Sequence, residues 1–186
     1  MAKMINSLYR NPKTMKEMAS VFKMQGGILV LGDFLDKTAH SQMLHFAKKK
    51  GKKLFRADLF SYKSLDGDTF LSSREFQEFV EMISGKKIKL IERANRLYGH
   101  RDFTLIHDEA KQNKRIVAVY HSAKKWDSSW GGQAVFTKGD GNPFVFPVGD
   151  NSLIIISCDK DDFEFTKYIN NKAGKNGFLQ VKSVFE

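Results

Sequence analysis

The chain has 186 residues, which suits one domain with a substantial core, and its 41% hydrophobic and 28% charged residues are ordinary for a globular protein. The single cysteine, Cys158, excludes an intrachain disulfide, which is typical of a reducing compartment. No apolar run approaches the roughly 20 residues that span a bilayer, and residues 1–12 lack the apolar segment of a signal peptide. We therefore expect a cytoplasmic protein without membrane association, or one carried inside a virion.

The formal net charge of +10 is partly local, because the run Lys48–Lys53 contains five lysines. Such a run attracts polyanions, so an acidic partner or a nucleic acid is a candidate partner for this basic surface. The run is also typical of a solvated helix end, where cations favour the carbonyl end of the helix dipole. No signature of a nucleic-acid-binding fold accompanies it, and both interpretations stay open.

The N-terminal residues 1–26 are expected to form an extension that is helical over Lys13–Met24 and ends at a glycine pair. The apolar run Ile28–Leu31 then predicts a strand. This strand would open a single domain that covers residues 27–186.

Two further helices are predicted in the first half of the chain. Asp33 or Asp36 precedes apolar residues on one helical face, and the basic run ends this helix. Ser72 and Glu75 resemble a capping box, in which the two side chains each bond an amide at the helix start. Apolar residues follow at helical spacing, and Gly85 is a suitable stop.

Strand-like segments dominate the rest of the chain. Leu54–Tyr62 alternates loosely and predicts one strand, and the later runs are short and separated mostly by Gly, Asn, Asp or Pro. These later runs are Lys87–Arg93, Phe103–His107, Arg115–Ser122, Ala134–Thr137, Phe144–Val148, Leu153–Ser157, Phe163–Ile169 and Phe178–Phe185. The predicted fold class is therefore α+β, mainly β: a sandwich or barrel with N-terminal helices packed on one sheet.

His107 and Glu109 are the first candidates for chemistry. On a strand, residues i and i+2 face the same side, so both side chains could reach one metal ion. Two such ligands and a distant third form the facial triad of non-haem Fe(II) oxygenases, which leaves positions open for cosubstrate and oxygen. The pair alone is also typical of a strand that simply ends beside acidic residues.

The segments after His107 strengthen the metal interpretation. Arg115–Tyr120 predicts a strand, Trp126 precedes a Gly-Gly pair that opens the next strand, and an Asn-x-Leu strand starts at Asn151. This order resembles the 2-oxoglutarate/Fe(II)-dependent dioxygenases, in particular the prolyl hydroxylase branch and especially the ribosomal-protein prolyl hydroxylases. The resemblance covers roughly Gly27 to Phe185, and it rests on the order and spacing of these elements together.

The resemblance implies a double-stranded β-helix, or jelly-roll barrel, that binds Fe(II) or another divalent cation and 2-oxoglutarate in its mouth. His107 would be the first metal ligand and would point into the mouth. Glu109 would stand where the family usually has Asp. Tyr98, nine residues before His107, would contact 2-oxoglutarate.

Two family positions carry unexpected residues. Counting from Asn151 places Glu164 at the family's distal His, so the third metal ligand would be Glu164, another residue or none. The family's Arg anchor for 2-oxoglutarate falls on Phe178 without a gap, and on Lys175 or Lys172 with one. Lysine can hold a carboxylate as a point charge, but it lacks the bidentate fork of arginine.

Other histidines compete with this assignment. His100 and Asp102 form a rival His-x-Asp pair, but the spacing to Trp126 fits the family better for His107. His121 lies at a strand end near the predicted site, and we expect a surface or half-buried side chain there rather than a ligand.

The sequence leaves two main functions open. The first is a 2-oxoglutarate/Fe(II)-dependent oxygenase of prolyl hydroxylase type, which would hydroxylate a peptide or protein substrate with an altered metal set of His107, Glu109 and Glu164. The second is a relative that keeps the jelly roll, has lost catalysis and serves as a binding or structural module. A small-molecule binder of the wider cupin-like jelly-roll group is a third option. The absent distal His and Arg anchor leave the enzyme assignment undecided.

Overall fold

The computed structural model describes residues 4–105, 114–139 and 141–186. The helices are α1 (Pro12–Met24), α2 (Lys37–Phe46) and α3 (Arg74–Ser84), with short 3-10 helices η1 (Ser7–Arg10), η2 (Phe70–Ser72), η3 (Ser128–Trp130) and η4 (Asn171–Ala173). The strands are β1 (Ile28–Leu31), β2 (Lys52–Arg56), β3 (Phe60–Ser64), β4 (Leu90–Tyr98), β5 (Phe103–Thr104), β6 (Arg115–Ser122), β7 (Ala134–Thr137), β8 (Phe144–Phe146), β9 (Ser152–Cys158), β10 (Phe163–Thr166) and β11 (Phe178–Phe185).

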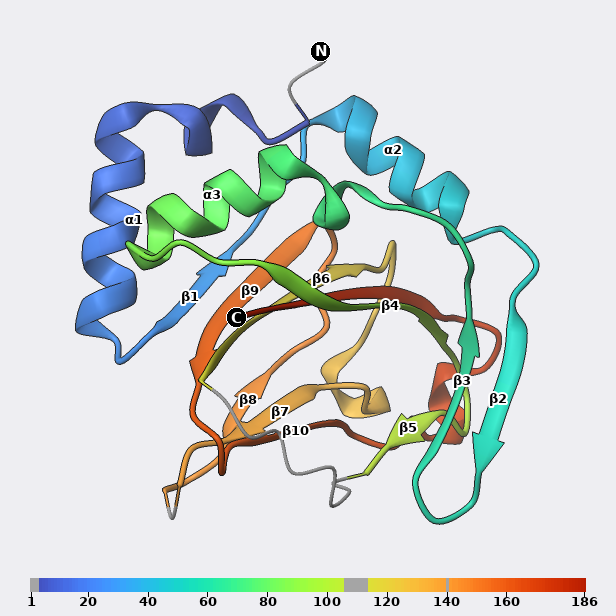
Figure 1. Cartoon of the computed structure of the whole chain (residues 1–186). Coiled ribbons are helices and arrows are strands. Elements are labelled where there is room, and N and C mark those ends of the chain that lie inside the picture. The colour runs from blue at the N-terminus through green and yellow to red at the C-terminus, as the bar shows by residue number, and fades with distance from the viewer. Residues whose placement is uncertain (1–3, 106–113, 140) are drawn as a thin grey trace.

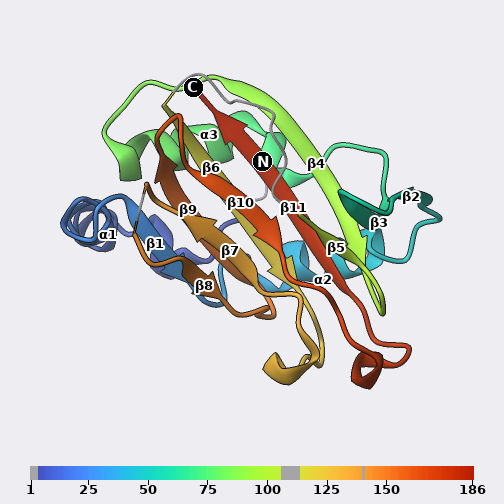
Figure 2. The ribbon, with the colours of Figure 1, turned by 90° about the horizontal axis from the view of Figure 1, so that it is seen from below.

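The strands form two antiparallel sheets that face one another. The larger sheet has the order β1-β9-β6-β11-β4-β3-β2, with β5 paired to β3, and the smaller sheet has the order β10-β7-β8. Helices α1, α2 and α3 cover one face of the larger sheet, and the smaller sheet lies against the other face (Figure 1; Figure 2). The predicted fold, mainly β with helices on one sheet of a jelly roll, is confirmed, although over the described residues no strand pairing joins the two sheets into a closed barrel.

The central strands of the larger sheet are covered on both faces, which explains their continuous apolar sequences. Every residue of β6 and β11 is buried. Along β6, Ile116 and Ala118 belong to the core beneath the helices, whereas Val117 and Val119 face the smaller sheet. The larger sheet therefore separates a helix-side core from an inter-sheet space.

Strand β11 places polar side chains in the inter-sheet space. Three of its helix-facing residues are apolar members of the helix-side core, Leu179, Val181 and Phe185, and the fourth, Ser183, donates to Leu71 O at 2.9 Å. By alternation, Gln180 and Lys182 face the smaller sheet, and each is 3% exposed. Because buried polar groups need polar partners, these two residues indicate that a candidate functional site lies in the inter-sheet space.

Helix α1 confirms the helix predicted over Lys13–Met24. Asn11 caps it by accepting hydrogen bonds from the backbone amides of the first turn, and Pro12 stands at the first helical position. Met18 and Phe22 are buried in the helix-side core. Across the described part of the chain, no helix has the length and apolar character to cross a membrane.

Helix α2 starts after the second of the two aspartates considered from sequence, because Asp36 accepts a hydrogen bond from Ala39 N at 2.8 Å. Asn151 fixes the approach to this helix. Its side chain accepts from Leu35 N and donates to Leu35 O, each at 2.9 Å, across 116 residues of sequence. Asn151, which opens the predicted Asn-x-Leu strand, thus joins β9 to the start of α2.

Helix α3 begins one residue later than predicted. Ser73, not Ser72, is the N-cap, and its side chain accepts from Phe76 N at 3.2 Å. Ser72 belongs to η2, and Glu75 falls one position too early to close a capping box, so that prediction was wrong. Gly85 ends the helix as predicted, in the left-handed conformation with φ of 69°.

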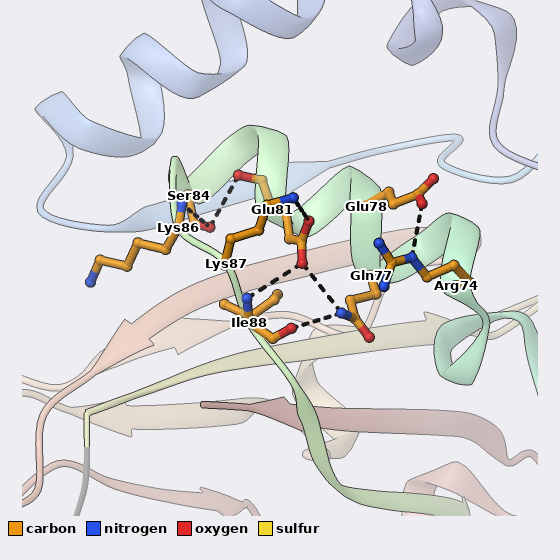
Figure 3. Close-up of polar contacts among 8 residues, drawn as sticks. All are labelled: Arg74, Gln77, Glu78, Glu81, Ser84, Lys86, Lys87 and Ile88. Atoms are coloured by element: carbon orange, nitrogen blue, oxygen red, sulfur yellow. Dashed lines mark hydrogen bonds and ion pairs between the residues drawn. The ribbon is translucent and has the colours of Figure 1, made fainter.

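The connection from α3 to β4 is held by Glu81 (Figure 3). The Glu81 carboxylate accepts hydrogen bonds from Lys87 at 2.9 Å, from Gln77 at 3.3 Å and from Ile88 N at 3.4 Å. The Lys87 and Gln77 donors lower the pKa of Glu81 to about 2. Gln77 also donates to Ile88 O at 2.7 Å, so the chain is fixed where it turns into the sheet.

The segment Leu54–Tyr62, predicted as one strand, is a hairpin. Strands β2 and β3 pair across the turn Ala57-Asp58-Leu59, with Arg56 opposite Phe60. Asp58 is the one turn-favouring residue among these three, so the sequence carries only a weak turn signal. The basic run Lys48–Lys53 follows α2 and continues into β2, an edge strand, and all of its lysines are exposed.

Candidate functional site

A cavity of about 270 Å³ lies between the two sheets. Its described walls come from β3, β4, β5, β6, β7, β10 and β11 and from adjoining loops, and they combine aromatic rings with charged side chains. Phe60 and Tyr62 are among the aromatic residues, and Arg96, Glu164 and Lys182 are among the charged ones.

An ion pair connects the two sheets inside this cavity. Lys182 on β11 contacts Glu164 on β10, and its Nζ lies 3.6 Å from Glu92 Oε1 on β4. The side chain of Lys182 is 4% exposed and that of Glu164 is 17% exposed. Burial lowers the pKa of Lys182, but the two carboxylates outweigh this effect and raise it. Lys182 therefore keeps a positive charge inside the protein.

Aromatic rings fill one end of the inter-sheet space. Phe178 stacks on Tyr98 with 5.3 Å between ring centroids, and Trp126 meets the Phe178 ring edge-on at 4.8 Å. Gly132, the second glycine of the predicted pair, has φ of 80°, and a Cβ there would lie 2.8 Å from the Phe178 ring. Only glycine gives both this conformation and this close approach, so it allows the rings to pack.

His121 is buried beside these rings, and not at the surface or half-buried position expected from sequence. Its exposure is 0%, its Nε2 lies 3.2 Å from the Gln180 amide nitrogen, and its ring meets Phe178 edge-on at 5.5 Å. Burial lowers the pKa of His121 to about 4. The imidazole is therefore neutral at pH 7.

Through His121, the free energy of unfolding is expected to fall by about 3 kcal/mol as the pH drops from about 6.5 to about 4. The folded-state pKa of about 4 lies below the ordinary 6.5, so in this window the unfolded chain binds a proton that the folded chain does not. The stability that the buried, neutral His121 contributes is fully present above the ordinary pKa of 6.5, and it is lost as the pH falls to the folded-state pKa of about 4. Urea unfolding of His121→Gln should lack this component, and the exposed His45→Gln should keep it. Equal pH dependence in wild type and His121→Gln would contradict the assignment.

The structure brings together only part of the predicted site. His107 and Glu109 lie outside the described residues. Glu164 lines the cavity. Tyr98 is buried on β4 against Phe178, outside the cavity wall.

The rival pair His100 and Asp102 does not lie on a strand. Arg101 between them has φ of 68°, which turns the backbone, and His100 is exposed. The Asp102 carboxylate accepts a hydrogen bond from Ser61 Oγ at 2.6 Å and contacts Lys53. Asp102 therefore ties the β2–β3 hairpin to the turn after β4.

The Lys182 ammonium lies against Glu164, the residue at the family's distal ligand position. Within residues 4–105, 114–139 and 141–186, no three His, Cys, Asp or Glu side chains lie close enough to hold a metal ion. A cation on the Glu164 carboxylate would also face the Lys182 ammonium that already contacts it. Like charges about 4 Å apart repel by about 4 kcal/mol per unit charge at an effective dielectric constant near 20. The structure therefore places Glu164 in an internal ion pair with Lys182.

The positions considered for the 2-oxoglutarate anchor do not line the cavity. Phe178 pairs directly with Tyr98 across β11 and β4, so the anchor position reached without a gap holds an aromatic ring. Lys175 and Lys172 are exposed near η4 and do not line the cavity. A buried carboxylate without a cation or hydrogen-bond donors is strongly unfavourable.

Sequence reasoning does not single out Lys182 or Arg96, although both line the cavity. The sequence signal that could have found them is the alternation of side chains between the two faces of a strand. Lys182 occupies a core-facing position in an apolar alternating strand, where a charged residue is unusual and implies a buried partner. Arg96 stands two residues before the buried Tyr98 and hence on the same face of β4.

No family model matches the chain, and no curated protein is significantly similar in sequence. Solved structures are similar in fold. An oxidoreductase of the 2OG-Fe(II) oxygenase family from Burkholderia pseudomallei has a TM-score of 0.70 and 13% identity, over 95% of this chain and 92% of that one. A prolyl-4-hydroxylase from Pseudomonas putida has a TM-score of 0.68 and 12% identity, over 91% and 98%.

A prolyl hydroxylase from Trichoplax adhaerens, solved in complex with a hypoxia inducible factor peptide fragment, has a TM-score of 0.68 and 11% identity, over 96% of this chain and 91% of that one. At such identities the likeness concerns the fold. Two facing antiparallel sheets with helices on one side, matched over nearly the whole chain, identify this protein as having the jelly-roll fold of the 2-oxoglutarate/Fe(II) oxygenases and prolyl hydroxylases.

Proposed function

We propose that this chain is a binding module built on the 2-oxoglutarate oxygenase fold, without metal-dependent hydroxylation. The observation that carries the proposal is the ion pair of Lys182 with Glu164, because it sets an ammonium beside the carboxylate at the resemblance's third ligand position. The aromatic cluster around Phe178 gives further support, because counting without a gap places Phe178, and so an aromatic ring, where the family has its Arg anchor.

A ligand of this module would enter the cavity between the sheets, whose mixed aromatic and charged walls suit a small organic molecule. The exposed lysines of Lys48–Lys53 would add a surface for an acidic partner, either a protein or a nucleic acid. The cytoplasm, expected from the single cysteine, would be its compartment.

An active 2-oxoglutarate/Fe(II) oxygenase of prolyl hydroxylase type is the second candidate. It is favoured by the fold similarity to oxygenases and by the peptide complex of the Trichoplax enzyme. In that case His107, Glu109 and Glu164 would hold the metal, Tyr98 and Lys175 would contact 2-oxoglutarate, and the substrate would be a peptide or protein.

An anaerobic titration with Fe(II) and Mn(II), followed by 2-oxoglutarate, oxygen and measurement of succinate, separates the two candidates. We expect no saturable metal binding and no succinate above a protein-free control, because the Lys182 ammonium opposes a cation at Glu164. His107→Ala is the matched variant. Metal binding or succinate release that wild type shows and His107→Ala loses would overturn the proposal and favour the oxygenase.

A further inference from the structure

We infer that the cavity between the sheets binds a small organic monocarboxylate through the guanidinium of Arg96. This inference rests on the proposed binding function and deepens it, because it names the chemical class of ligand that the same cavity takes.

The net charge of the described lining favours a ligand that carries a single negative charge. Four cationic side chains line the cavity against three carboxylates, and four minus three leaves an excess of one positive charge. The cations are Arg96, Arg115, Lys160 and Lys182. A monoanion would neutralise this excess, whereas a dianion would exceed it.

Two of these cationic side chains bind other groups of the protein. Arg115 donates hydrogen bonds to Asp159 O at 2.9 Å and to Asp162 O at 2.6 Å, so its guanidinium holds the loop between β9 and β10. Lys182 contacts Glu164 as described above. Lys160 is exposed in that same loop.

Arg96 and Arg115 each have a buried Nε without a hydrogen-bond partner among the described residues, but Arg115 also donates to two backbone carbonyls. Burial lowers the pKa of Arg96, but the nearby Tyr98, Tyr62 and Glu164 outweigh this effect and raise it. The Arg96 guanidinium lies over the Tyr62 ring, with Cζ 4.9 Å from the ring centroid. Guanidinium stays charged in proteins, and a buried donor without an acceptor is unfavourable. A carboxylate in the cavity would satisfy this donor with a charge-assisted hydrogen bond.

The size and the remaining walls of the cavity limit the ligand. A volume of about 270 Å³ is below the roughly 300–1,000 Å³ of pockets for drug-sized molecules, so the ligand is small. Phe60 and Tyr62 stand with ring centroids 5.4 Å apart on one side, and Phe136 lines another part of the wall. These rings favour an acid with a flat apolar body, for which benzoate is the simplest probe.

Isothermal titration of the wild-type chain with benzoate, in excess EDTA, tests the inference. We expect saturable benzoate binding, and binding of the neutral isostere benzamide weaker by about tenfold to a hundredfold, because the charged hydrogen bond to Arg96 is lost. We expect the dicarboxylate succinate to bind more weakly than benzoate. Equal affinity for benzoate and benzamide, or tighter binding of succinate, would overturn the inference.

Two arginines on one strand provide matched variants. Arg96→Gln is expected to weaken benzoate binding by about tenfold to a hundredfold. Arg93→Gln on the same strand should not, because Arg93 points away from the cavity and pairs with Asp68. Benzoate affinity unchanged in Arg96→Gln would overturn the inference. Far-UV circular dichroism checks that both variants fold, and the benzamide comparison needs no variant.

The two proposals fail in distinguishable ways. Excess EDTA removes divalent metal, so the benzoate titration reports on Arg96 without a metal centre. Succinate release that depends on His107 would overturn the binding-module proposal and leave the benzoate result standing on its own. An absence of both succinate release and benzoate binding would overturn only the assignment of the ligand.

Discussion

Replacing Lys182 with Met is expected to lower the free energy of unfolding by about 3–5 kcal/mol, the usual cost of removing one partner from a buried ion pair. The variant removes the ammonium that contacts Glu164 and lies 3.6 Å from Glu92, while the Glu164 side chain stays largely buried. Urea unfolding monitored by tryptophan fluorescence measures the change.

A second variant and a control separate charge from packing. The double variant Lys182→Met/Glu164→Leu should regain most of the loss, because apolar replacement of both buried partners is often neutral or stabilising. Lys87→Met removes a lysine that is 89% exposed from its pair with Glu81, and we expect less than about 1 kcal/mol. If Lys182→Met proved as mild as Lys87→Met, the buried ion pair would not be a main support of the inter-sheet space.

Replacing Phe178 with Ala is expected to cost about 3–5 kcal/mol, the range for removing a large buried aromatic side chain. Phe178 is 1% exposed and contacts Tyr98, Trp126 and His121, so its removal would leave a void that these rings cannot easily close. Chemical denaturation at pH 7 measures the loss.

Phe55→Ala is the matched control for this prediction. Phe55 is 64% exposed on the edge strand β2, and its removal should change the free energy of unfolding by no more than about 0.5 kcal/mol. A Phe178→Ala variant as stable as Phe55→Ala would show that the aromatic cluster does not pack as described, and would reopen this end of the inter-sheet space to a ligand.

Several strands were predictable because their residues are unambiguous. Ile28–Leu31, Arg115–Ser122, Ala134–Thr137 and Phe178–Phe185 are apolar or β-branched runs between turn residues, and each coincides with a strand. In the jelly roll these runs lie between two covering layers, which favours continuous apolar sequence over strict alternation.

Two predicted strands had wrong boundaries. Lys87–Arg93 predicted a strand that in fact runs from Leu90 to Tyr98, because Glu81 and its donors hold the segment after α3 and delay its entry into the sheet. The hairpin within Leu54–Tyr62 was missed because Asp58 alone marks its turn.

The candidate site was predictable only as positions along the chain. Spacing placed Glu164 at the family's distal ligand and Phe178 at its anchor, and the structure sets Glu164 on the cavity wall and Phe178 in the inter-sheet space. The partner of Glu164 is Lys182, 18 residues away on the opposite sheet, and no local pattern encodes that contact. His121 was expected at or near the surface because the sequence gives the end of a strand but not what covers it.

The sequence by itself determined a mainly β domain with helices near its N-terminus, because short apolar strands between turn residues and amphipathic helices are local properties that act through a few neighbouring residues. The jelly roll was implied by the resemblance to the dioxygenases. Only the tertiary structure decided what the interior can bind. Burial, charge pairing and ring packing depend on which residues from distant strands share one low-dielectric space, and there Lys182, Glu164 and Phe178 meet as an ion pair beside an aromatic cluster.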